Sequence, residues 1–347
     1  MTDYTSLQSK TFNFLRFPLM VFIVFIHTIN LSDVANNVFV QDIYYLITRV
    51  IAALGVPTFF IISGYYFFYT KKENEVFNKK SYFFKLKKRV KTLLIPFLLW
   101  NLFMIIFYIV VPLLIPSFGA DGQIKTVKQF FVAFVSYNYH TPINYPLWYV
   151  RDLMILCILS PIIYLLIKYL KIIPLIILFI VAVWRFYIPM PRMDLTYQSF
   201  FYFPLGAYFA IHHKNIIEYC RKLSFYPLIV YIIFVVAFLI TKDDTINRIG
   251  IIFGLIATYN IVSYFVENNK LKENPFLSEM SFFLFCFHAL PIIIVSSRLK
   301  SLLPQTDWGY LINYFLSVFI VVLLAIITYK IMKKYFPRFT SILMGGR

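Results

Sequence analysis

Long apolar runs alternate with short polar stretches along most of this chain. Runs of about 20 predominantly apolar residues are long enough to cross the hydrocarbon core of a bilayer as helices. The pattern therefore predicts an all-α, polytopic integral membrane protein with about ten transmembrane helices. We expect these spans near residues 11–31, 43–69, 92–114, 147–167, 172–188, 197–212, 225–241, 246–266, 276–297 and 308–332.

Composition supports a membrane protein rather than a soluble fold. The chain is 61% hydrophobic and only 14% charged, whereas soluble domains are about 45–50% apolar and about 25% charged. No linker or internal repeat divides the 347 residues, so we expect a single transmembrane domain over residues 1–347 without a separate soluble domain. Neither the three cysteines nor His212 and His213 have the spacing of metal ligands, and we expect no metal site.

The net charge of +18 indicates how the chain is oriented in the membrane. Cytoplasmic loops of membrane proteins are enriched in lysine and arginine. These residues gather in alternate loops, most densely in residues 71–91, which predicts that both termini are cytoplasmic and that the protein lies in the cell membrane. Because the charges follow the membrane faces rather than one patch, we expect membrane lipid and no nucleic acid as a partner.

Two ionisable residues lie inside the first apolar segment, Arg16 and His27. Eleven helical steps of about 100° bring them to within about 20° of the same direction, about 16 Å apart along the axis. Ionisable side chains within a membrane span are costly and mark functional sites. The pair therefore predicts a site on one face of this helix, with Arg16 nearer the cytoplasm.

Several motifs, in their order along the chain, carry a resemblance to a known family. Arg16 and His27, separated by ten residues, are followed by FFIISGYYFF, KLKKRVKTLLIP, PLWYVRDLMILCILSP, FYFPLGAYFA and SEMSFFLFCFHALP. Together these segments resemble the membrane acyltransferase family 3 over nearly the whole chain. The resemblance implies an O-acyltransferase that transfers an acyl group, usually acetyl, from cytoplasmic acyl-CoA to a hydroxyl of an envelope glycan or glycolipid precursor. Acetyl-CoA would then be a donor substrate, with no permanently bound cofactor.

A donor site is expected at the cytoplasmic depth of the first three spans. There, basic side chains can meet phosphates, and a glycine allows a ligand to approach the backbone closely. Plain helix packing by small residues and the enrichment of lysine on the cytoplasmic side are alternative explanations for these residues. The candidates for acyl-CoA binding are Arg16, Ser63, Gly64, Tyr65, Lys88 and Arg89.

Histidine suits the transfer step, because an acceptor hydroxyl must lose its proton as it attacks the thioester. His27 is the candidate catalytic base. His288, near the middle of the ninth span, is the candidate that assists it or orients the acyl group. The alternative for both is a histidine that hydrogen-bonds between helices only for packing.

Four residues are expected on the acceptor side, at the outer ends of the second and fourth spans: Arg49, Trp148, Arg151 and Asp152. Adjacent residues diverge on a helix, so Arg151 and Asp152 need not pair with each other. One of them can instead pair with Arg49 or orient His27.

Aromatic residues near the fourth span suggest a platform for a sugar ring. Trp148 with Tyr137, Tyr139 and Tyr145 would form it, although the aromatic belt found at membrane interfaces explains them as well.

A transporter or flippase of a glycan precursor or small metabolite is the alternative function, since charged residues within spans also line permeation routes. Against it, the sequence contains no inverted repeat with interrupted helices in matching positions. The sequence leaves the acceptor, the acyl chain length, a covalent acyl-enzyme and the oligomeric state open.

Overall fold

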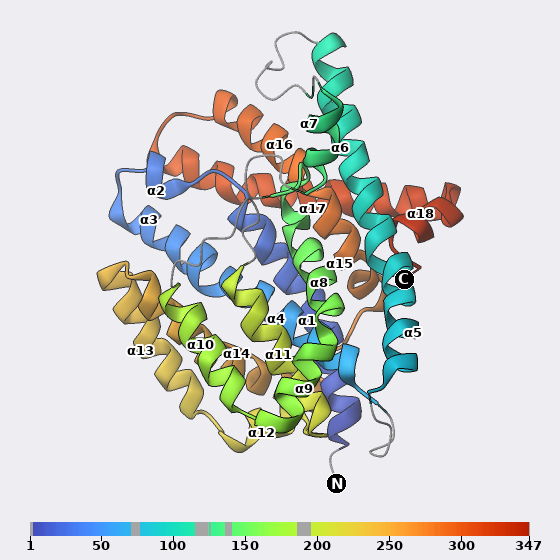
Figure 1. Ribbon diagram of the computed structural model, residues 1–347. Helices are drawn as coiled ribbons and strands as arrows, with labels where there is room; N and C mark the ends of the chain where they lie inside the picture. Colours follow the sequence, from blue (N-terminus) through green and yellow to red (C-terminus); the bar gives the residue numbers. More distant parts are fainter. Residues whose placement is uncertain are drawn as a thin grey trace.

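The computed structural model describes residues 3–70, 77–114, 124, 126–135, 141–185 and 196–346. These residues form helices joined by short connections, with no strand among them, which confirms the all-α prediction (Figure 1). The elements in chain order are α1 (Tyr4–Ile26), α2 (Leu31–Val34), α3 (Val38–Tyr44), the π-helix η1 (Tyr45–Ile51), η2 (Ala52–Leu54), α4 (Gly55–Phe68), α5 (Lys79–Arg89), the π-helix η3 (Val90–Leu94), α6 (Ile95–Leu114), α7 (Val127–Ala133), η4 (Tyr145–Leu147), α8 (Trp148–Ile158), α9 (Ser160–Leu170), α10 (Ile173–Trp184), α11 (Tyr197–Ile211), α12 (Ile216–Lys222), α13 (Tyr226–Thr241), α14 (Asp244–Glu267), α15 (Pro275–Phe287), α16 (Ala289–Leu302), α17 (Asp307–Tyr335) and α18 (Pro337–Leu343).

The described helices have the lengths and composition of a multi-pass membrane protein. Five helical segments are long and apolar enough to cross a bilayer, and the number rises to eight if three bent helix pairs each make one crossing. Each of the ten predicted spans has a helical counterpart, but α10 is shorter than a full crossing and α11 has only 15 residues. The number of ten crossings therefore stays a prediction.

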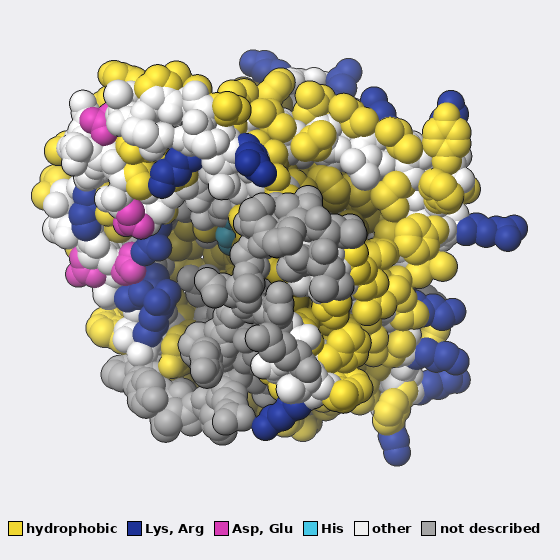
Figure 2. All heavy atoms as spheres, turned by 90° about the horizontal axis from the view of Figure 1, so that it is seen from above, with side chains coloured by type: hydrophobic (Ala, Val, Ile, Leu, Met, Phe, Trp, Pro, Cys, Tyr) yellow, Lys and Arg dark blue, Asp and Glu magenta, His cyan; other side chains and the backbone are white. Residues whose placement is uncertain are grey.

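Large apolar side chains point outward from several of these helices. Ile162 of α9, Ile177 of α10, Ile233 of α13 and Phe319 of α17 are each more than half exposed. Seen from above, hydrophobic side chains cover much of one flank of the molecule (Figure 2). Such extensive apolar surface would be unstable in water and suits contact with lipid.

Two of the predicted spans are sharply bent near a proline. The helices α8 and α9 meet at 65°, with Pro161 at the start of α9, and α15 and α16 meet at 70°. Pro291 has no N–H to donate to the carbonyl of Phe287 four residues earlier, which accounts for the second bend. The ninth predicted span, residues 276–297, therefore consists of two helices with a break at His288.

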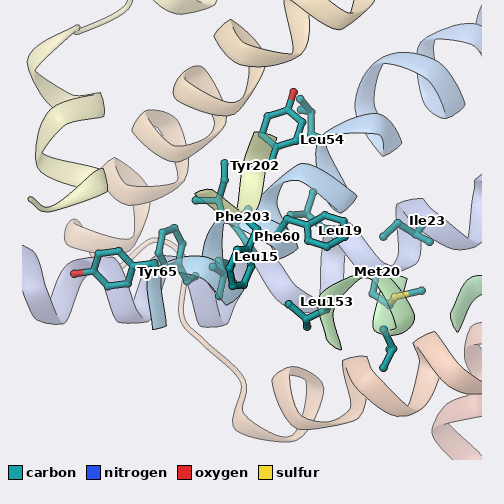
Figure 3. Packing of buried hydrophobic residues seen from close by; sticks show 14 of the residues in the cluster. Leu15, Leu19, Met20, Ile23, Leu54, Phe60, Tyr65, Leu153, Tyr202 and Phe203 are labelled. Carbon is teal, nitrogen blue, oxygen red and sulfur yellow. The ribbon is translucent and has the colours of Figure 1, made fainter. Parts of the chain in front are cut away.

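Helix α1 lies at the centre of the fold and packs against α4, α14, α15 and α17. Figure 3 shows its side chains Leu15, Leu19 and Met20 among Phe60 of α4 and Leu153 of α8, all of them buried. This apolar packing fixes α1 in the core, so the polar side chains on the same helix are held in defined positions.

The helices α4 and α11 approach each other unusually closely at two glycines. A Cβ atom on Gly64 would lie 2.0 Å from the carbonyl oxygen of Phe203, and one on Gly206 would lie 2.1 Å from that of Ile61. Only glycine leaves room for such backbone contact. Gly64 therefore packs against another helix, as the packing alternative describes.

Two contacts join helix ends that the predicted topology places on the same side of the membrane. Near the amino terminus, Asn13 of α1 donates a hydrogen bond to Glu273, 3.0 Å away, just before α15 begins. At the opposite end, Lys242 pairs with Asp42 at 2.6 Å, between the ends of α13 and α3. The sidedness of these two ends rests on the charge pattern and stays a prediction.

Candidate functional site

A cavity of about 650 Å³ lies between α1, α4, α8 and α15. Its size is within the range of small-molecule and cofactor sites. Arg89 and Glu273 line it toward the amino-terminal end of α1, and His27 and Trp148 line it toward the other end. Viewed from above, the molecule is hollowed, and a histidine side chain is visible in the hollow (Figure 2).

Arg16 and His27 both line this cavity, so the prediction that they share one side of α1 is confirmed. The helix is shorter than predicted, because it ends at Ile26 and not at residue 31. His27 is the residue that caps it, with φ of −104° and ψ of 10°. The imidazole is therefore carried by a helix end rather than by a regular turn.

The structure brings only part of the predicted donor site to the cavity. Arg16, Ser63 and Arg89 line it. Lys88 does not line it, and Tyr65 is buried in the core with its ring stacked on Tyr69 at 5.5 Å. With Gly64 packed against α11, the cationic lining near the amino-terminal end of α1 consists of Arg16 and Arg89.

Tyr149 is a cavity residue that the sequence analysis missed. Its hydroxyl is 3.0 Å from that of Ser63, a hydrogen bond that joins α8 to α4 in the wall. On α8 the cavity is lined by Trp148, Tyr149, Val150 and Leu153, and Leu153 lies one turn from Tyr149 and Val150. The local sequence offers no signal for Tyr149, since one helical turn from Trp148 lie Arg151 and Asp152, which do not line the cavity.

Three rings meet at the far end of the cavity. The ring of His27 lies 5.3 Å from that of His288 and 4.8 Å from that of Tyr145, measured between ring centres. His288 is fully buried, and its Nδ1 donates a hydrogen bond to the carbonyl oxygen of Leu284 at 2.9 Å. Two candidate histidines from distant parts of the sequence therefore adjoin each other, as their proposed joint role requires.

A buried amide network supports this end of the site. The backbone N–H of Asn144 donates to the side chain of Asn101 at 3.1 Å, and the Asn144 amide donates to the carbonyl of Cys286 at 3.0 Å. These two hydrogen bonds hold the segment just before Tyr145 against the last turn of α15. Neither asparagine was predicted as part of the site, although a lone Asn101 in an apolar span is itself a signal of an interhelical hydrogen bond.

Arg151 and Asp152 pair with each other, which the sequence left open. Two guanidinium nitrogens of Arg151 donate to Oδ1 of Asp152 at 3.1 and 3.2 Å, because the long arginine side chain folds back along α8. The other carboxylate oxygen accepts hydrogen bonds from Thr196 and Ser199 at the start of α11. Neither residue lines the cavity, so this buried pair joins α8 to α11.

Arg49 also lies apart from the cavity. It forms an ion pair with Asp244 at 2.5 Å, with both side chains nearly half exposed. It therefore pairs with neither Arg151 nor Asp152. Of the proposed sugar platform, Trp148 and Tyr145 adjoin the cavity or His27, whereas residues 137 and 139 lie outside the described part of the chain.

No group of three histidine, cysteine or acidic side chains within the described ranges is arranged to hold a metal ion. The charged side chains that line the cavity are of both signs. Arg16 and Arg89 are cationic, and Glu273 and Glu279 are acidic. Glu279 is held by Lys333 at 2.7 Å and by the hydroxyl of Tyr329 at 2.6 Å.

Helices long enough to span a bilayer and a buried ionisable cavity define an all-α, multi-pass membrane protein. The family model described as an acyltransferase domain matches residues 10–330, so the chain belongs to the acyltransferase 3 family. It is also similar to the succinoglycan biosynthesis protein ExoH of Rhizobium meliloti (strain 1021). The two are 26% identical over 357 residues, which cover 98% of this chain and 92% of that protein. No solved structure matches the chain.

Proposed function

We propose that this protein transfers an acetyl group from cytoplasmic acetyl-CoA to a hydroxyl of an envelope polysaccharide or of its glycolipid precursor, at the cell membrane. Membership of an acyltransferase family supports the reaction type. The name of the succinoglycan biosynthesis relative supports a polysaccharide acceptor.

The observation that carries the proposal is the continuity of the cavity between two chemically different ends. Arg16 and Arg89 supply positive charge at the end near the amino terminus of α1, where phosphates of a donor can bind. His27 and Trp148 lie at the other end. A donor whose phosphates bind at the arginines can extend its narrow thioester arm along the cavity toward His27.

In the proposed reaction, His27 accepts the proton of the acceptor hydroxyl as its oxygen attacks the thioester carbonyl. The new ester bond forms as the carbon–sulfur bond breaks. His27 then returns the proton to the sulfur, so coenzyme A leaves as its free thiol. Positioned general bases of this kind contribute about 10²- to 10⁴-fold to rate. Trp148 offers a face on which a sugar ring can stack.

The test supplies labelled acetyl-CoA to inverted membrane vesicles and follows the label into envelope glycans. We expect transfer with the parent chain and a loss of at least about 100-fold with His27→Ala. The matched control is His213→Asn, because His213 is an exposed histidine beyond the end of α11, away from the cavity.

Two results would count against the proposal. Undiminished transfer by His27→Ala would remove the catalytic assignment. If the parent chain labels no envelope fraction from acetyl-CoA or from longer acyl-CoAs, while a glycan precursor crosses the vesicle membrane only when the protein is present, the protein is a transporter.

A further inference from the structure

His288 lies at a break in the membrane helix and not within a regular turn. Helix α15 ends at Phe287, α16 begins at Ala289, and the two meet at 70°. The side chain is fully buried, next to His27. A polar ring at such a position needs hydrogen bonds for both of its nitrogens.

One nitrogen of His288 has its partner and the other does not. Nδ1 is 2.9 Å from the carbonyl oxygen of Leu284, which can only accept, so Nδ1 carries a proton. In the neutral ring Nε2 then has a lone pair. Within the described residues nothing donates a hydrogen bond to Nε2, although it is buried. A buried acceptor left without a donor costs about 1–3 kcal/mol, so this atom calls for a functional explanation.

The ring of His27 is at the right distance to supply that donor. Two imidazoles that share a hydrogen bond of about 3 Å have ring centres about 5 Å apart, and the observed separation is 5.3 Å with the planes inclined by 30°. No other described side chain hydrogen-bonds the His27 ring, which is only partly buried. It can therefore rotate to direct an N–H at its neighbour.

We infer that His288 is a positioning residue, whose Nε2 accepts an N–H from His27 and thereby sets the tautomer of that ring. The second nitrogen of His27 is left unprotonated toward the cavity, where the acceptor hydroxyl arrives. The chain of atoms runs from the Leu284 carbonyl through His288 to His27. A carboxylate does the same for the histidine of a serine protease. This inference rests on the proposed function for its catalytic consequence, but the hydrogen bond itself does not.

Two substitutions of His288 distinguish the roles of its two ring nitrogens. In His288→Gln the side-chain oxygen can replace the acceptor Nε2, and in His288→Asn the amide can replace the donor Nδ1 without reaching His27. We expect His288→Gln to keep transfer within about tenfold of the parent, and His288→Asn to lower kcat about 100-fold, as for a base in the wrong tautomer. The KM for acetyl-CoA should change in neither, since Arg16 and Arg89 lie at the other end of the cavity.

A readout that needs no acyl transfer keeps this inference apart from the proposed function. The chain has only five histidines, so ¹⁵N-histidine NMR in lipid can resolve them, with His288→Gln assigning the signals of residue 288. We expect the Nε2 signal of His288 to have the shift of a hydrogen-bonded acceptor and to move to that of a free acceptor in His27→Ala. The control His213→Asn should remove one set of signals only.

The inference is overturned if the His288 signal is unchanged in His27→Ala, whether or not the parent chain transfers acetyl groups. It is also overturned if the Gln and Asn variants, purified as equally stable protein, lose the same activity, because His288 would then act only in packing. If the parent chain transfers no acetyl group but the Nε2 signal still responds to His27→Ala, the proposed function is refuted and the hydrogen bond is established.

Discussion

Replacing Gly64 by alanine is expected to destabilise the protein strongly without changing its affinity for acetyl-CoA. The added Cβ would lie 2.0 Å from the Phe203 carbonyl oxygen and 2.9 Å from its carbon. Because the obstacle is backbone, no side-chain rotation relieves it, and α4 and α11 must separate by more than about 1 Å before the Cβ and the oxygen reach an ordinary contact distance. Overpacking of this kind costs about 1–3 kcal/mol, and we expect the upper end, because Gly206 makes the reciprocal contact with Ile61.

The assay is thermal unfolding of detergent-purified protein, together with the KM for acetyl-CoA measured on the folded fraction. Gly55→Ala is the control, since its Cβ would meet the Ile23 side chain at 3.0 Å and would be in ordinary contact with the Leu19 carbonyl oxygen at 3.5 Å. We expect this control to stay within about 1 kcal/mol of the parent. The reasoning would be refuted by a Gly64→Ala protein that is as stable as the parent but has a raised KM, because that result would place Gly64 at the donor.

Other substitutions test the remaining assignments. Arg16→Gln should raise the KM for acetyl-CoA about tenfold or more, as expected for a lost hydrogen bond from a charged group, and an unchanged KM would remove Arg16 from the donor site. Asp152→Asn should lower the free energy of unfolding by about 3 kcal/mol, because it leaves the buried Arg151 charge uncompensated, and wild-type stability would contradict the buried ion pair. Arg49→Gln should cost less than about 1 kcal/mol in the same unfolding assay, because its pair with Asp244 is nearly half exposed.

The sequence predicts best those features that depend on neighbours along one helix. Apolar length indicates the membrane helices, and the helical period correctly places Arg16 and His27 on one cavity. It fails where the partner is distant in sequence. Nothing near Gly64 in the chain reveals that α11 approaches it closely, with Gly206 at the same contact.

Side-chain length explains why Arg151 and Asp152 pair although they are adjacent on one helix. The argument that adjacent residues diverge concerns the directions of Cβ atoms, whereas a guanidinium can bend back over several ångströms to reach its neighbour. In an apolar surrounding, two opposite charges gain much by meeting, since water does not compete for them. The sequence also gives no indication that Thr196 would complete the carboxylate's hydrogen bonds.

The two ends of the cavity are built differently. The helical period of the sequence can place residues at the arginine end, but not at the histidine end. Arg16 projects from the regular part of α1, so counting turns is enough to place it. The other end is made from helix ends: His27 caps α1, His288 lies at the bend between α15 and α16, and Tyr145 begins a single turn before α8. At such points the regular hydrogen bonds stop. The rings of Tyr145 and His288, from two other segments, therefore both lie within about 5 Å of the His27 ring. Proline at position 291 is the local cause of one of these breaks, and it is consequently the best sequence signal for where the histidine end of the site forms.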